Sequence, residues 1–138
     1  MTPELLVNID VADLDKAVAF YREAFGLSIG RRFGEFGVEL LGSSSAIYLL
    51  VKPAGTPASK ATGQTRDYRR HWTPVHLDFV VPEIEAAVAR AEAAGATREG
   101  EIQTNPWGRL ALMADPFGHG FCLIQFLGRG YDEIADPA

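Results

Sequence analysis

The chain has 138 residues, of which 47% are hydrophobic and 22% charged, and its formal net charge is −5 at pH 7. This length and composition are typical of one globular domain, and they exclude a fibrous, low-complexity or disordered chain. The acidic balance without a large basic cluster argues against nucleic-acid binding, and no run approaches the roughly 20 apolar residues of a membrane span.

Cysteine content and the start of the sequence bear on location. The chain holds a single cysteine, Cys122, so no intrachain disulfide can form. The first ten residues have neither a basic start nor an apolar run of signal-peptide length. We therefore expect a cytoplasmic protein with no membrane partner.

The first half of the chain predicts one strand, one helix and three further strands. Residues Leu5–Val11 alternate as a strand does, with apolar side chains on one face. A helix over Leu14–Phe25 follows, because Asp13 can cap its start and Gly26 can end it. The later strands are expected at Ile29–Phe33, Phe36–Leu41 and Ala46–Lys52.

Residues 53–73 are rich in Pro, Gly, Ser and Thr and predict a connecting loop. At about 20 residues it is longer than most structureless loops, so it is either a flexible linker or a functional loop. Its three arginines, Arg66, Arg69 and Arg70, are interpreted as a solvated loop face.

The second half repeats the order of the first. A strand over Val75–Val81 precedes a helix over Ile84–Ala94, which Gly95 can end. Further strands are expected near Ala96–Glu99, Arg109–Ala114 and Gly120–Leu127, with Asp115–Gly118 as the last turn. The polar tail, 128–138, is expected to fray or to pack on a partner.

The two halves are related by an internal repeat. Residues Leu5–Ala24 match Val75–Ala94 at a constant offset of 70, and Ile47–Leu50 match Phe121–Ile124 at an offset of 74. We therefore predict an α+β fold of two tandem βαβββ modules whose curved mixed sheet forms a cup. The modules would span 4–52 and 74–127 of one domain, with the segment 53–73 joining them.

Two segments carry a resemblance to a known family. The run from Val11 to Tyr21 with Phe25–Leu27, and the run from Asp115 to Gln125, resemble the vicinal oxygen chelate (VOC) superfamily of glyoxalases, bleomycin resistance proteins and dioxygenases. The resemblance extends over Leu5–Phe126. It implies the tandem βαβββ fold, but that fold carries several unrelated chemistries.

The resemblance also identifies four positions at which enzymes of that superfamily bind one divalent metal. In this chain they hold Leu6, Tyr48, His76 and Cys122. Only His76 is a usual ligand at a usual place, since leucine cannot coordinate and a phenol has a pKa near 10. A catalytic metal generally takes three protein ligands, so we predict no metal or other cofactor. A His76–Cys122 pair helped by Asp78 or His119 is the alternative.

A ligand cleft is predicted instead on the concave side of the cup. Strand alternation puts His76 and Asp78 on the face opposite Leu77 and Phe79, and the repeat puts the matching residues of the first module on the same side. With the aromatic and polar residues of nearby turns, the predicted ligand-binding set is Leu6, Asn8, Phe36, Tyr48, Trp72, His76, Asp78, Trp107, Arg109 and Cys122.

The resemblance and this lining together imply a metal-free protein that sequesters a hydrophobic or aromatic small molecule. The cleft would lie between modules or between the subunits of a homodimer, which is common for this kind of protein. The alternative is a glyoxalase-like lyase, an isomerase or a dioxygenase. Such an enzyme would use a divalent metal or acid–base catalysis, with His76 as the best catalytic candidate.

Overall fold

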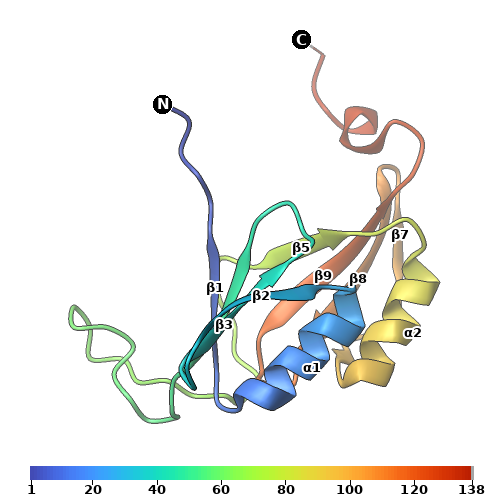
Figure 1. Cartoon of the computed structure of the whole chain (residues 1–138). Helices are drawn as coiled ribbons and strands as arrows, with labels where there is room; N and C mark the ends of the chain where they lie inside the picture. The colour runs from blue at the N-terminus through green and yellow to red at the C-terminus, as the bar shows by residue number, and fades with distance from the viewer. Residues whose placement is uncertain (138) are drawn as a thin grey trace. The chain divides into compact units, whose positions relative to one another are not determined.

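The computed structural model describes residues 1–137 and divides the chain into two compact units, Met1–Arg69 and the part from Arg70 onward. The boundary between them lies inside the predicted connecting segment. Each unit holds one βαβββ module (Figure 1), which confirms the predicted α+β fold. None of the helices among the described residues is long and apolar enough to cross a membrane.

The first module forms a four-stranded sheet with the strand order β1-β4-β3-β2. Strands β1 and β4 run parallel, and the other neighbouring pairs run antiparallel. Helix α1 packs on β3 and β4. The elements are β1 (Val7–Val11), α1 (Leu14–Phe25), β2 (Ser28–Phe33), β3 (Gly37–Leu41) and β4 (Ile47–Val51).

The second module repeats this topology with one interruption. Its sheet has the order β5-β9-β8-β6, and the short strand β7 also pairs with β8. The described chain thus has nine strands where eight were predicted, because Gly100 at a φ of 99° lies between two short strands that share one neighbour. The elements are β5 (Leu77–Val80), α2 (Ile84–Ala94), β6 (Thr97–Arg98), β7 (Gln103–Asn105), β8 (Gly108–Ala114) and β9 (Gly120–Phe126).

Both helices begin and end at the predicted residues. The Asp13 carboxylate accepts a hydrogen bond from the Lys16 N–H at 3.1 Å, and Gly26 takes the left-handed conformation at a φ of 68°. Glu83 precedes α2 without a side-chain capping bond. The strands are one or two residues shorter than predicted at several ends, since apolar residues such as Leu5 and Val75 continue beyond the hydrogen-bonded ladders.

Each sheet has one face covered by its own helix, and the opposite face is called the helix-free face below. In the first module the helix-covered face holds the fully buried side chains of Val11, Val38 and Leu49. Because strand side chains alternate, Glu39 and Tyr48 lie on the helix-free face. In the second module Leu112 and Cys122 occupy the equivalent positions, and Asp78 lies opposite Cys122 on the same face.

The connecting segment is structured rather than a plain linker. Pro57 and Thr65 form an isolated bridge, and the Tyr68 hydroxyl donates to the Lys52 carbonyl at 2.5 Å. Arg66 is mostly buried, pairs with Asp10 at 2.7 Å and donates to the carbonyls of Pro57 and Ala58. Its interpretation as a solvated loop residue is therefore wrong.

The described part of the tail contains a short 3-10 helix, η1 (Gly130–Glu133). Tyr131 from this helix packs against Trp107, with ring centroids 5.2 Å apart, and against Phe126, at 4.8 Å. Half of the Tyr131 surface stays exposed. The homodimer expected from the sequence stays a prediction.

Candidate functional site

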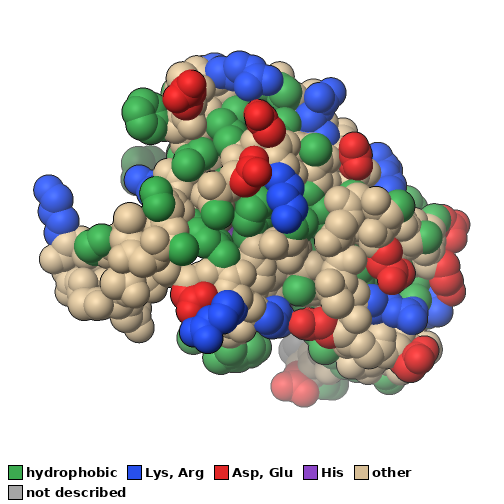
Figure 2. Space-filling model, turned by 90° about the horizontal axis from the view of Figure 1, so that it is seen from below, with side chains coloured by type: hydrophobic (Ala, Val, Ile, Leu, Met, Phe, Trp, Pro, Cys, Tyr) green, Lys and Arg blue, Asp and Glu red, His purple; other side chains and the backbone are tan. Residues whose placement is uncertain are grey.

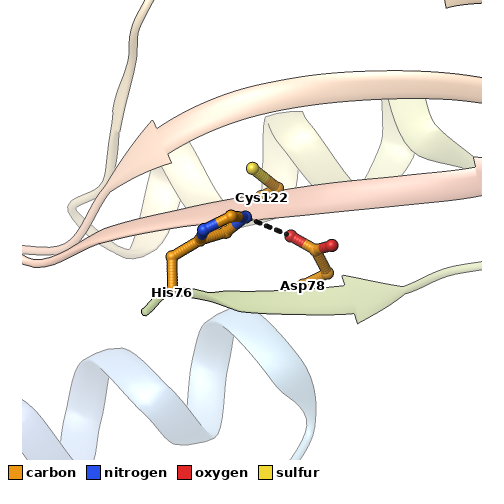
Figure 3. A group of neighbouring side chains, drawn as sticks. All are labelled: His76, Asp78 and Cys122. Atoms are coloured by element: carbon orange, nitrogen blue, oxygen red, sulfur yellow. Dashed lines mark ion pairs between the residues drawn. The ribbon is translucent and has the colours of Figure 1, made fainter. Parts of the chain in front are cut away.

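Three of the predicted site residues meet in the second module. His76 lies just before β5, Asp78 within β5, and Cys122 opposite Asp78 in the β5–β9 ladder. Figure 3 shows the His76 ring and the Asp78 carboxylate side by side, with the Cys122 sulfur next to them. His76 Nε2 lies 3.1 Å from Asp78 Oδ1, and one ligand atom of each residue lies within 4.8 Å of the others.

The thiol of Cys122 is buried and neutral. Burial, and after it the negative charge of Asp78, raises the pKa of Cys122 to about 12. A nucleophilic cysteine needs the opposite shift, toward the thiolate at neutral pH. Cys122 therefore serves as a small apolar group at the site.

The same three residues are the metal-ligating group found among the described residues. One imidazole nitrogen, one carboxylate oxygen and one sulfur suit a borderline ion such as Zn²⁺ better than Mg²⁺ or Ca²⁺. The donor set thus fits a metal in type and number, although binding would have to displace the proton of a thiol whose pKa is raised. His119, the other conceivable helper, instead lies beside His71, with Nδ1 and Nε2 at 3.2 Å.

An open pocket adjoins this cluster and encloses about 380 Å³ of empty space, its open mouth included. Three predicted residues, Trp72, His76 and Cys122, are part of its wall. The indole of Trp72 is 80% exposed and stands at the pocket as a large flat surface. The full lining is Arg70, Trp72, Thr73, His76, Glu99, Leu112, Met113, Gly120, Phe121 and Cys122.

Arg70 is a wall residue that the sequence interpretation missed. Its Nε lies 2.7 Å from Glu99 Oε2 and its Nη2 lies 3.0 Å from Glu99 Oε1, although 29 residues separate them. A Cβ on Gly120 would come within 2.6 Å of Arg70 Nη2, so the glycine makes room for the guanidinium. Arg70 thus lines the pocket in a pair with Glu99, while 42% of its side chain stays exposed. The only sequence signal for this contact is Gly120, the first residue of β9.

Two other predicted residues of the second module lie elsewhere. Arg109 pairs with Glu85 in the first turn of α2, so its side chain is on the helix-covered face. Trp107 packs against Phe126, with ring centroids 6.3 Å apart, and against the tail. The structure therefore places neither side chain in the pocket wall.

The predicted residues of the first module form a different arrangement. Tyr48 donates a hydrogen bond to Glu39 Oε2 at 2.9 Å and accepts one from Arg31 Nη2 at 3.1 Å. Asn8 lies opposite Tyr48 in the β1–β4 ladder. Leu6 lies before β1 and Phe36 in the β2–β3 turn, and both are exposed. Arg31 and Glu39 were not among the predicted residues.

On the face shown in Figure 2, basic and acidic side chains are interspersed and do not gather into a basic patch. An extended basic surface is the electrostatic mark of nucleic-acid binding. The visible surface therefore gives no support to a nucleic-acid partner.

Comparisons with known proteins agree with the fold. Residues 6–124 match the family model of the glyoxalase-like domain. The anthracycline biosynthesis protein DauV of Streptomyces sp. strain C5 is 32% identical over 133 residues, which are 96% of this chain and 44% of DauV. This chain thus spans less than half of that relative. An uncharacterized protein of Mycobacterium bovis is 30% identical over 127 residues, with 89% of this chain and 83% of that protein covered.

Among solved structures, a fosfomycin resistance protein of Listeria monocytogenes in complex with Mn(II) and a dihydroxypropylphosphonic acid superposes with a TM-score of 0.74. The match covers 98% of this chain and all of that one, at 19% identity. At this identity the similarity shows the fold.

Proposed function

Because the chain belongs to the glyoxalase-like domain family of the VOC superfamily, we propose that it binds and sequesters a small hydrophobic or aromatic molecule without a metal. The observation that carries the proposal is the open pocket of the second module. The pocket is small and opens to solvent, so a ligand would be only partly enclosed.

The character of the wall favours an apolar, flat ligand. Leu112, Met113 and Phe121 supply apolar surface, and the neutral thiol of Cys122 adds to it. Trp72 offers a large flat contact area at low entropic cost. The charged groups of Arg70 and Glu99 neutralise each other, so the pocket requires no net charge on the ligand.

The name of one relative supports the same class of ligand. DauV is named for anthracycline biosynthesis, and anthracyclines contain flat fused rings that suit a wall with an exposed tryptophan. Only the part of DauV that this chain matches is relevant, which is 44% of its length.

A thermal-shift screen of planar aromatic compounds on protein stripped of metal with a chelator tests the proposal. A compound at 100 times its Kd stabilises the folded state by about 2.7 kcal/mol through mass action. We expect Trp72→Ala to reduce that stabilisation and Leu5→Ala, a truncation of an exposed side chain outside the pocket, to leave it unchanged. Equal stabilisation of wild type and Trp72→Ala by every compound found would rule out this pocket as the site.

A second candidate function rests on the three-residue cluster. His76, Asp78 and Cys122 would hold a transition metal, which would supply Lewis-acid chemistry to a lyase, an isomerase or a dioxygenase. Without a metal, the contact between His76 and Asp78 at 3.1 Å would orient the imidazole as a general base.

Elemental analysis of freshly purified protein separates these candidates. Sequestration without a metal predicts less than one tenth of an equivalent of transition metal, in roughly the same amount for wild type and His76→Ala. One equivalent in wild type that is lost in His76→Ala would favour the enzyme instead.

A further inference from the structure

Glu39 and Asp115 are the two buried charged residues among the described residues. The burial of Asp115 has a local explanation, because its carboxylate accepts hydrogen bonds from the Phe117 and His119 N–H groups in its own turn. Glu39 lies in the middle of β3, where no turn requires an acid. Its burial therefore needs another explanation.

That explanation is a closed set of hydrogen bonds on the helix-free face of the first module. Oε1 of Glu39 accepts from the backbone N–H of Arg31 at 3.0 Å and from Arg31 Nε at 3.1 Å. Oε2 accepts from Arg31 Nη2 at 2.7 Å and from the Tyr48 hydroxyl at 2.9 Å. The bonds from Arg31 lower the pKa of Glu39 to about 2, so the carboxylate is ionised and has little capacity left for a ligand.

The backbone is shaped around this contact. The β2–β3 register shifts between Ile29 and Arg32, and such a bulge re-aims the side chain that follows it. A Cβ on Gly30 would lie 2.5 Å from Glu39 Oε1, so only glycine leaves room for the carboxylate there. Both features direct the backbone N–H and the guanidinium of Arg31 toward the same acid.

The outer edge of the Arg31 guanidinium stays available. Glu39 and Tyr48 engage Nε and Nη2, whereas Nη1 has no acceptor among residues 1–137, and the side chain is 68% exposed. The Phe33 ring lies 5.9 Å from Arg31 Cζ, and the rings of Phe33 and Tyr48 lie 6.3 Å apart. An oriented guanidinium edge thus lies beside two aromatic rings.

We propose that this edge and the Phe33 ring form a second ligand site, which takes an aromatic carboxylate. The carboxylate would accept hydrogen bonds from the Nη1 edge, and the flat ring would pack on Phe33. Since Glu39 already offsets the charge of Arg31, a bare anion gains little, and recognition requires the acid and the ring together. None of its residues belongs to the lining of the pocket of the second module.

An NMR titration with 2-naphthoate tests this site through the side-chain Nε–H resonance of Arg31. We expect saturable shifts at Arg31 and Phe33, and at least tenfold weaker binding of neutral 2-naphthol and of acetate. Arg31→Lys keeps a cation next to Glu39 but loses the planar fork, so it should weaken 2-naphthoate binding by about tenfold. Arg32→Gln is the matched control, because Arg32 lies opposite Val38 and hence on the other face. It should change the affinity less than twofold.

Four results would overturn the proposal. Equal affinity of wild type and Arg31→Lys would exclude a role for the planar guanidinium, and a loss in Arg32→Gln as large as that in Arg31→Lys would show that the effect is not specific to Arg31. Shifts confined to the pocket residues Trp72, His76 and Cys122 would refute this site while leaving the proposed function intact. Phe33→Leu, which spares the Glu39 contacts, gives an independent check if Arg31→Lys fails to fold, and unchanged affinity in that variant would also refute the site.

Discussion

The two modules share one backbone plan but place opposite chemistry on their helix-free faces. The register aligns Asn8, Tyr48 and Glu39 across three strands of the first module, and Asp78, Cys122 and Leu112 across the same strands of the second. In the first module an acid at the β3 position is saturated by its own arginine. In the second, leucine stands at that position and the face holds a pocket.

This difference shows how a repeated unit can take up separate tasks. A saturated ion pair fills its space and leaves only its outer edge for a ligand. An apolar residue at the same position leaves a floor that a ligand can cover. The side chain at this one position of β3 or β8 therefore determines whether the helix-free face offers only the edge of an ion pair or a pocket. The strand pairing around that position is the same in both modules.

The largest loss of stability is expected from substitutions in the helix-covered cores. Phe20 of α1 is buried beside Tyr21 and Phe25, with ring centroids 4.9 and 6.2 Å away, whereas α2 buries only Ile84, Val88 and Ala91. We expect Phe20→Ala to lower the free energy of unfolding by about 3–5 kcal/mol, and Ile84→Val by about 0.5–1.5 kcal/mol. Urea denaturation measures both, and a Phe20→Ala effect no larger than that of Ile84→Val would show that the aromatic packing is loose.

Gly30 and Gly120 each lie against a charged side chain, and replacing them with alanine should reduce stability by different amounts. In Gly30→Ala the new methyl meets a carboxylate held by four hydrogen bonds, so we expect a loss of about 1–3 kcal/mol. In Gly120→Ala it meets the end of the Arg70 side chain, which can move, so the loss should stay below about 1 kcal/mol. Denaturant midpoints give the comparison, and the reverse order would mean that Arg70 is the more rigid partner.

Acid should weaken the first module through Glu39. Its folded-state pKa of about 2 lies below the ordinary value of 4.5, so its stabilising effect is complete above pH 4.5 and is lost as the pH falls toward 2. We expect the stability of wild type to fall more steeply across this window than that of Glu39→Gln. Parallel curves from chemical denaturation at several pH values would contradict the ionised state of Glu39.

Alkali should weaken the second module through Cys122. Its folded-state pKa of about 12 lies above the ordinary value of 9.0, so its stabilising effect is complete below pH 9 and is lost as the pH rises toward 12. Because tyrosines and lysines titrate in the same range, the difference in slope between wild type and Cys122→Ala is the quantity to measure. A steeper slope in the variant than in wild type would contradict it.

The sequence predicted the elements well because their signals are local. Asp13, Gly26 and the apolar stripe from Leu14 to Phe25 all lie within one helix, and its bounds were predicted to the residue. The internal repeat then predicted the second module from the first. The strand ends were predicted less accurately. A strand ends where its neighbour stops forming hydrogen bonds with it, and the apolar pattern of the sequence can continue beyond that point.

The candidate site could be predicted only in part because its contacts join distant residues. Strand alternation brought His76, Asp78 and Cys122 together, as expected. The pairing of Arg70 with Glu99 depends on how the segment before β5 crosses the sheet, which no local pattern records. Arg109 was misplaced because a turn next to a tryptophan resembles a cleft rim, whereas α2 supplies Glu85 as its partner.

The order of strand pairing also bears on how the chain folds. In each module the first strand pairs with the last, as Val7 does with Ile47 and Leu77 with Phe121, so each sheet closes a loop of about 40 residues. Neither loop contains strands of the other sheet. A chain that leaves the ribosome can therefore complete its first sheet before the second is synthesised. The slow pairing of parallel strands then occurs once within each short segment, and no such pairing has to form across the whole chain.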